Sequence, residues 1–168
     1  TEALTFGGQL VPGSVLNNTE TWNGSNWTEV NNLTTARDAL YGSGTYTSSL
    51  AYGGYNGSAN VTDTEVWNGT NWTEVNNLGT ARRLGGSSGI SSTSALATSG
   101  YTSTNVANVE SWNGTNWTEV NDVNTARRGT NSFGTQTSSL FSGGYTTTAV
   151  AITESWNGTN WTEVNDLN

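Results

Sequence analysis

Apolar and polar residues alternate in short runs along the last quarter of the chain, and each run ends at Gly or Asn. Alternation with a period of two, bounded by turn residues, predicts β-strands. Between Thr125 and Asn168 it predicts four strands: Thr130 to Gly134, which is weak, Ser139 to Ser142, Ala151 to Trp156, and Asn160 to Val164. Pro12 is the only proline and helix-favouring residues are scarce, so we expect an all-β protein without helices.

The same pattern recurs along the chain around one ten-residue sequence. WNGTNWTEVN occupies 67–76, 112–121 and 156–165, and 22–31 differs only at Ser25. Its leading tryptophans, Trp22, Trp67, Trp112 and Trp156, are 45, 45 and 44 residues apart. Periods of this length are typical of solenoids, propellers and repeat arrays. We therefore expect a single domain, 1–168, with repeats at about 1–34 (incomplete), 35–79, 80–124 and 125–168.

Asn-Gly in each copy predicts a hairpin between the third and fourth strands, because both residues tolerate positive φ. A two-residue loop would set the two tryptophans of a copy diagonally, and a four-residue loop would set them directly opposite. Both registers put the rings on one face. We expect packing between repeat units rather than sugar stacking from these pairs: Trp22 and Trp27, Trp67 and Trp72, Trp112 and Trp117, and Trp156 and Trp161.

The second strand carries a leucine at one aligned position, namely Leu4, Leu50, Leu96 and Leu140. The neighbouring aromatic residue is not so regular. Phe6 and Tyr52 stand just before the glycine pair, whereas Phe141 comes one residue earlier. Successive residues of a strand point to opposite faces. We therefore expect Phe141 on the other face, in units that pack similarly but not identically.

Composition narrows the range of functions. The chain has 13 acidic and 5 basic residues, a net charge of -8, and neither His nor Cys. It lacks the usual general base, the commonest metal ligand and any thiolate. Nucleic acid and anionic lipid surfaces would be repelled. There is no run of 18 apolar residues and no apolar leader, so we expect neither membrane insertion nor a secretion signal.

Each hairpin also places two glutamates on its tryptophan face, as in Glu65 and Glu74, and the four-residue register sets them opposite each other. Like charges so placed destabilise a sheet unless a cation or proton lies between them. Arg37, Arg82 and Arg127 follow the fourth strands and can bridge two carboxylates with a planar guanidinium. We expect structural Glu–Arg clusters. A divalent metal held by the glutamates and Asn carbonyls, or glycosidase-like acid and base work, are weaker alternatives.

The order of Arg, weak strand, apolar strand ending in Gly-Gly, loop, Glu-x-aromatic and Trp-Thr-Glu-Val resembles the kelch repeat over nearly the whole chain. The kelch double glycine matches Gly7-Gly8, Gly53-Gly54 and Gly143-Gly144, with Ser99-Gly100 as a departure. Its strand-three aromatic, strand-four Trp and closing arginine match the tryptophan pairs and the three arginines already named. The Trp- and Asn-rich copies also look like kelch-like repeat proteins of marine bacteriophages, which are taken for virion or tail-fibre components.

The kelch resemblance implies a β-propeller of four kelch-like, four-stranded blades per chain, one of which lacks its first strand. The first copy begins directly with its second strand, so fifteen strands are present where four blades need sixteen. We expect another protomer to supply the missing strand, a three-stranded blade to complete the ring, or the chain to belong to a longer array. Galactose oxidase shares kelch-like blades, but its copper chemistry needs His and Cys. Sialidase Asp-box sequences are absent too.

The segments between the second and third strands vary most: Gln9 to Asn18, Tyr55 to Thr62, Tyr101 to Val106 and Tyr145 to Val150. Function often lies on loops held by a rigid scaffold. We expect these segments to project from one face, where Tyr55, Tyr101, Tyr145, Asn56 and Asn105 are candidate binding residues for a neutral glycan or a protein. The tyrosines could equally cap the blade edge.

The sequence thus predicts a non-enzymatic structural or adhesive module without a cofactor, in a virion or an extracellular setting. It would act through its loops or through self-association within a larger assembly. A lectin-like propeller is the first alternative. An engineered or reconstructed repeat protein is the second.

Overall fold

The computed structural model describes residues 2–11 and 13–168. Within these residues the chain forms fifteen β-strands and no helix, and hence no helix that could cross a membrane. All sheets are antiparallel, and we number them along the chain. Sheet 1 contains β1 (Ala3–Leu10), β2 (Ser14–Trp22) and β3 (Trp27–Glu29).

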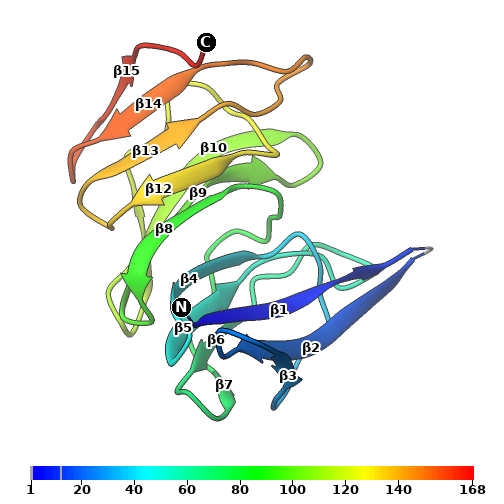
Figure 1. The fold of residues 1–168 in the computed structure, drawn as a ribbon. Helices are drawn as coiled ribbons and strands as arrows, with labels where there is room; N and C mark the ends of the chain where they lie inside the picture. The colour runs from blue at the N-terminus through cyan, green and yellow to red at the C-terminus, as the bar shows by residue number, and fades with distance from the viewer. Residues whose placement is uncertain (1, 12) are drawn as a thin grey trace.

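Sheets 2, 3 and 4 have four strands each, in chain order across the sheet (Figure 1). Sheet 2 contains β4 (Tyr41–Thr45), β5 (Ser48–Tyr52), β6 (Thr64–Trp67) and β7 (Trp72–Glu74). Sheet 3 contains β8 (Gly86–Ser91), β9 (Ser94–Tyr101), β10 (Asn105–Trp112) and β11 (Trp117–Val120). Sheet 4 contains β12 (Asn131–Gly134), β13 (Ser139–Ser142), β14 (Thr153–Trp156) and β15 (Trp161–Val164). The all-β prediction is confirmed, and the four strands expected in the last copy are all present.

The sheets follow one another in an array whose inner edges meet. The first strand of sheet 3, β8, packs against both β4 and β12. Figure 1 shows sheets 1 and 4 at the two ends of this array, and no strand of β1–β3 packs extensively on β12–β15 in the described chain. Four radially arranged antiparallel sheets are compatible with a β-propeller. The described sheets form an open array, and sheet 1 has three strands.

The core lies between the sheets and consists of three separate clusters. The cluster between sheets 1 and 2 includes Leu33, Trp67 and Trp72. Sheets 2 and 3 enclose a second cluster and sheets 3 and 4 a third. Each sheet is a single layer of three or four strands and has no core of its own. Its apolar side chains are buried only where they pack against the neighbouring sheet.

One additional ring enters each cluster and packs on a strand-four tryptophan. Phe6 lies 4.9 Å from Trp72, Tyr52 4.7 Å from Trp117 and Phe141 6.1 Å from Trp161, between ring centroids. Phe6 pairs with Thr19 and Tyr52 with Thr64, whereas Phe141 pairs with a glutamate, Glu154. Phe141 therefore points to the opposite face, as predicted. The ring at the third interface comes from sheet 4 instead of sheet 3.

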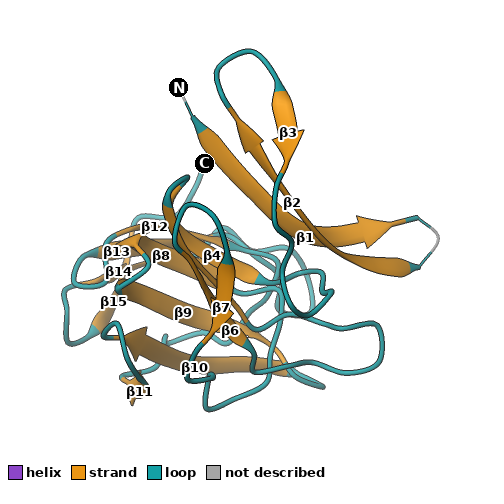
Figure 2. Ribbon diagram, turned by 90° about the horizontal axis from the view of Figure 1, so that it is seen from below, coloured by secondary structure: helices purple, strands orange, loops and turns teal. Residues whose placement is uncertain are grey.

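Two of the four variable segments are not loops. Gln9 to Asn18 falls mostly within β1 and β2, which extend beyond the other sheets (Figure 2). Tyr101 ends β9, and Asn105 begins β10 and pairs with it. The prediction of loops was wrong here because the backbone ladder continues past the glycines, so that Leu10 pairs with Ser14 and Tyr101 with Asn105. Tyr55 to Thr62 and Tyr145 to Val150 lie outside the strands, with isolated bridges only.

The paired glycines end the second strand with a backbone that other residues rarely adopt. Gly53 and Gly54 have φ of 60° and 106°. A Cβ on Gly53 would stand 2.7 Å from the carbonyl oxygen of Arg82. In the third copy Ser99 adopts φ 59°, and its hydroxyl donates to the Arg127 carbonyl. The serine departure from the glycine pair is thus offset by a hydrogen bond of its own.

Gly53→Ala should lower the free energy of unfolding by at least about 2 kcal/mol, because positive φ and contact with the Arg82 carbonyl act together. Gly129→Ala is the matched control, since Gly129 has φ 63° and nothing within 4 Å of an added Cβ. It should lose only about 1 kcal/mol. Urea unfolding followed by tryptophan fluorescence measures both. Equal losses would show that the carbonyl contact contributes nothing.

Candidate functional site

The register of the repeated hairpin is the four-residue one. Trp22 pairs directly with Trp27, and Trp67 with Trp72. The ring centroids of the latter pair lie 5.4 Å apart. The Asn68 side chain accepts hydrogen bonds from the backbone N–H groups of Thr70 and Asn71, and the other copies repeat this turn. The Asn-Gly sequence therefore makes the turn with its side chain as well as its backbone.

The strand-four tryptophan joins each sheet to the one before it. Trp72 Nε1 donates to Thr19 Oγ1 of sheet 1 at 2.9 Å, and Trp117 Nε1 donates to Thr64 Oγ1 of sheet 2 at 3.0 Å. At the third interface the aligned residue is Val109, which has no acceptor. Trp161 Nε1 is buried without a partner in the described chain. The sequence reasoning missed this bond, although the Thr, Thr, Val, Thr series immediately before Glu-x-Trp is visible when the copies are aligned.

Arginine and glutamate form buried ion pairs at the same interfaces. Arg37 Nη2 lies 2.8 Å from Glu65 Oε1, and both side chains are fully buried. Arg82 pairs with Glu110 and Arg127 with Glu154 in the same way. Each glutamate also accepts a backbone N–H from the linker, as Glu65 does from Thr34 at 2.8 Å. The predicted Glu–Arg clusters are present.

These clusters differ from the expectation in one respect. Each arginine meets only the strand-three glutamate and does not bridge both carboxylates of the hairpin. Arg127, for example, also donates to the carbonyl oxygens of Phe141 and Gly143, both at 2.9 Å. The guanidinium N–H groups that we expected to bind a second glutamate bind backbone carbonyls instead. The strand-four glutamates, such as Glu74, point to solvent, where their charge needs no counterion.

Asparagines at the end of the copy link the sheets at their outer edge. Asn31 Nδ2 donates to Thr70 O at 3.0 Å and to Asn71 Oδ1 at 2.7 Å. The equivalents Asn76 and Asn121 make the same two bonds to sheets 3 and 4. The asparagines of the repeated sequence thus serve turns and contacts between sheets, whereas its threonine and glutamate side chains, such as Thr73 and Glu74, are exposed.

The candidate tyrosines lie along one edge of the array and alternate with two arginines that the sequence reasoning did not single out. Arg83 stands 4.4 Å from the ring centre of Tyr55. Arg128 stands 4.6 Å from the Tyr101 ring and 4.9 Å from the Tyr145 ring. We call these five residues the tyrosine–arginine row. The recurrence of Arg-Arg at 82–83 and 127–128 was its sequence signal.

The row changes the assessment of the candidate binding residues. A guanidinium lies over each tyrosine ring, where a sugar would have stacked. Asn105 Nδ2 donates to Tyr145 O, and its Oδ1 accepts from Arg128. Asn56 Oδ1 accepts the backbone N–H groups of Ser58 and Ala59 within its own loop. The three tyrosines lie along one edge as expected, but they contact Arg83 and Arg128 from neighbouring units.

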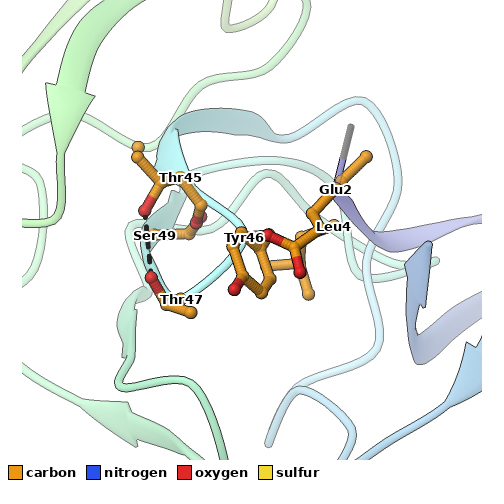
Figure 3. A pocket seen from close by; sticks show the side chains of 8 residues that line it. Glu2, Leu4, Thr45, Tyr46, Thr47 and Ser49 are labelled. Atoms are coloured by element: carbon orange, nitrogen blue, oxygen red, sulfur yellow. Dashed lines mark hydrogen bonds between the residues drawn. The ribbon is translucent and has the colours of Figure 1, made fainter. Parts of the chain in front are cut away.

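A hollow of about 670 Å³ lies between β1 and the turn from β4 to β5. Figure 3 shows Glu2, Leu4, Tyr46 and the hydroxyls of Thr45 and Thr47 around it. The neighbouring Glu2 carboxylate raises the pKa of the exposed Tyr46. The hollow offers one carboxylate and several unactivated hydroxyls. In residues 2–11 and 13–168 no three acidic side chains come together as a metal site.

No protein-family model matches the chain, and no curated protein matches it. The assignment of roles therefore depends on the geometry described above. That geometry assigns the repeated residues to contacts within and between sheets.

Val109→Thr should raise the free energy of unfolding by about 1 kcal/mol, because the new hydroxyl would accept the buried Trp161 Nε1–H. Thr64→Val is the reciprocal change and should cost about 1–3 kcal/mol by leaving Trp117 Nε1 without a partner. Both are measured by urea unfolding. A destabilised Val109→Thr protein would show that the third interface does not share the geometry of the other two.

Arg82→Met should lower the free energy of unfolding by about 3–5 kcal/mol, because Glu110 would remain buried without its counterion. Adding Glu110→Gln to this variant should recover part of the loss, since the buried charge is then removed. The exposed Glu119→Gln is the control and should recover nothing. If Arg82→Met were as stable as the original chain, a structural role for the Arg82–Glu110 pair would be contradicted.

Proposed function

We propose that the chain is a non-enzymatic structural module, a building or adhesive unit of a larger assembly. This proposal is supported by the contacts that the repeated side chains make. At the three internal interfaces the strand-four tryptophans, the arginine–glutamate pairs and the asparagines that follow strand four contact a neighbouring sheet. Repetition then serves a rigid scaffold, and no copy is distinguished from the others as a reaction site would be.

The kelch-like propeller is the architecture that we propose for the complete assembly. Its support is the match of aromatic and tryptophan in each copy, of the glycine pair in three copies and of three arginines to strand ends and interfaces. The setting we propose is a virion or an extracellular fibre, on the resemblance in sequence alone. A net charge of -8 with two arginines outside the buried pairs is compatible with surfaces that avoid nucleic acid.

The tyrosine–arginine row supports a structural rather than a saccharide-binding role for that edge. Arg83 contacts a ring of sheet 2 while its backbone pairs with Tyr101 of sheet 3. Asn60 Nδ2 from sheet 2 donates to Tyr101 O and Thr102 O of sheet 3. These contacts hold neighbouring sheets at a fixed distance along the edge. The row is then a second set of links between sheets, opposite the asparagine turns.

A glycan array separates the structural module from the lectin-like alternative. We expect the original chain to bind no neutral glycan, and Tyr145→Ala to behave identically, because a guanidinium already stands over each tyrosine ring. Tyr46→Ala is the control, an exposed tyrosine of the β4–β5 turn away from the row. Binding by the original chain and by Tyr46→Ala, but not by Tyr145→Ala, would overturn the proposal in favour of a lectin.

A further inference from the structure

Sheet 1 has a face that is covered in every other sheet. This face, which we call the first face, carries Ala3, Glu20, Trp22 and Trp27. Trp27 is 49 % exposed, whereas the equivalent Trp72 and Trp161 are 7 % and 6 % exposed against the preceding sheet. No arginine reaches Glu20 in the described chain, although its three equivalents are ion-paired. The first face therefore carries the side chains of an interface between sheets, but no other sheet of the described chain covers it.

Sheet 4 has the opposite half of the same interface. This surface, the last face, carries Phe133, Leu140, Thr153, Val164 and Leu167. Leu140 is 44 % exposed where Leu50 and Leu96 are fully buried, and Leu167 is 56 % exposed where Leu33 is 2 % exposed. The register makes Phe133 the equivalent of Ser43 and Ser88. A phenylalanine thus occupies, on the uncovered sheet, a position that is serine on the covered ones.

The polar groups of the two faces also match. Thr64 Oγ1 donates to Thr62 O while it accepts Trp117 Nε1, and Thr153 Oγ1 donates to Ala151 O in the same way. Thr153 Oγ1 could therefore accept a hydrogen bond from Trp27 Nε1 if sheet 1 of another copy packed on sheet 4 as sheet 3 packs on sheet 2. Asn165 aligns with Asn31, Asn76 and Asn121, which bind the Asn-Gly turn of the following sheet. The turn at Asn23–Asn26 is its equivalent partner.

We propose that the last face of one chain binds the first face of a second copy, in the register of the three internal interfaces. This inference rests on the proposed structural function and names its partner. In the complex Trp27 donates to the partner's Thr153, and Leu140, Val164 and Leu167 of one copy cover the tryptophan pair of the other. Phe133 packs on the side of Ala3, where sheet 1 has no fourth described strand.

A second copy is the occupant because its last face supplies the half-interface that the first face lacks, and within the described chain sheets 1 and 4 do not pack extensively on each other. The three internal interfaces show that these two kinds of face bind each other, with an aromatic pair and a leucine at each and a Trp–Thr bond at the first two. The Glu20 carboxylate would be met by the backbone N–H of Asn168, the equivalent of Thr34, Gly79 and Asn124. The two surfaces differ, so the contact is heterologous and builds a ring or an open chain of copies.

Blocking one face at a time tests this arrangement. Trp27→Lys puts a charge on the first face only, and Leu167→Lys puts one on the last face only. By light scattering the original chain should form oligomers, and each variant alone should be monomeric. Mixed together, the two variants should form a one-to-one dimer, since each retains the face that the other lacks. Both residues are half-exposed, and circular dichroism confirms that each variant is folded.

A finer pair of variants tests the register. Thr153→Val should weaken association at least about fivefold by removing the acceptor of Trp27, with unchanged stability of the monomer. Thr64→Val removes the same bond inside the chain and should lower stability without this effect on association. Equal association of Thr153→Val and the original chain would overturn the register.

The outcomes separate this inference from the structural function. A monomeric original chain, or mixed variants that stay monomeric, would overturn the docking while leaving a non-enzymatic scaffold intact. If Leu167→Lys alone still dimerised and Trp27→Lys did not, first face would bind first face, and the inference would be wrong. Glycan binding lost in Tyr145→Ala would overturn the proposed function and leave the association result unaffected.

Discussion

The contact between neighbouring sheets is the constraint on which the rest of the structure depends. Each sheet has two faces and few strands, so it cannot remove its tryptophans from water alone. The buried arginine–glutamate pair makes this contact specific, because an ionised carboxylate is tolerated inside only where a guanidinium and backbone N–H groups meet it. Glu65, with Arg37 and the Thr34 amide, shows all of these requirements in one place.

The interfaces are built from the same parts but vary in detail, and the variation is informative. The ring that packs on the strand-four tryptophan comes from the preceding sheet as Phe6 or Tyr52, and from the following sheet as Phe141. In both arrangements an aromatic ring fills the space between the two sheets. The third interface also loses one hydrogen bond at Val109. A repeated scaffold therefore tolerates exchange of partners across an interface as long as the space stays filled.

Much of this could be predicted from local pattern. The strands, the Asn-Gly hairpins, the shared tryptophan face and the side change of Phe141 all follow from a period of two and from turn chemistry. Interactions that cross between units could not be assigned in detail. The sequence does not say which of two glutamates an arginine reaches, that Thr64 accepts an indole N–H, or that Arg83 and Arg128 cover the tyrosines. Those depend on the distance and angle between sheets, which arise only when the whole array packs.

Hydrogen exchange of the eight indole N–H groups, resolved by NMR in dilute protein, tests most directly whether packing between sheets is the purpose of the repeated tryptophans. The account predicts slow exchange at Trp72 and Trp117, whose Nε1 atoms are bonded to the preceding sheet, and fast exchange at the uncovered Trp27. Raising the protein concentration should slow exchange at Trp27 and leave Trp72 and Trp117 unchanged. Fast exchange at Trp72 and Trp117 would contradict the account, because the repeated tryptophans would then not be held between sheets.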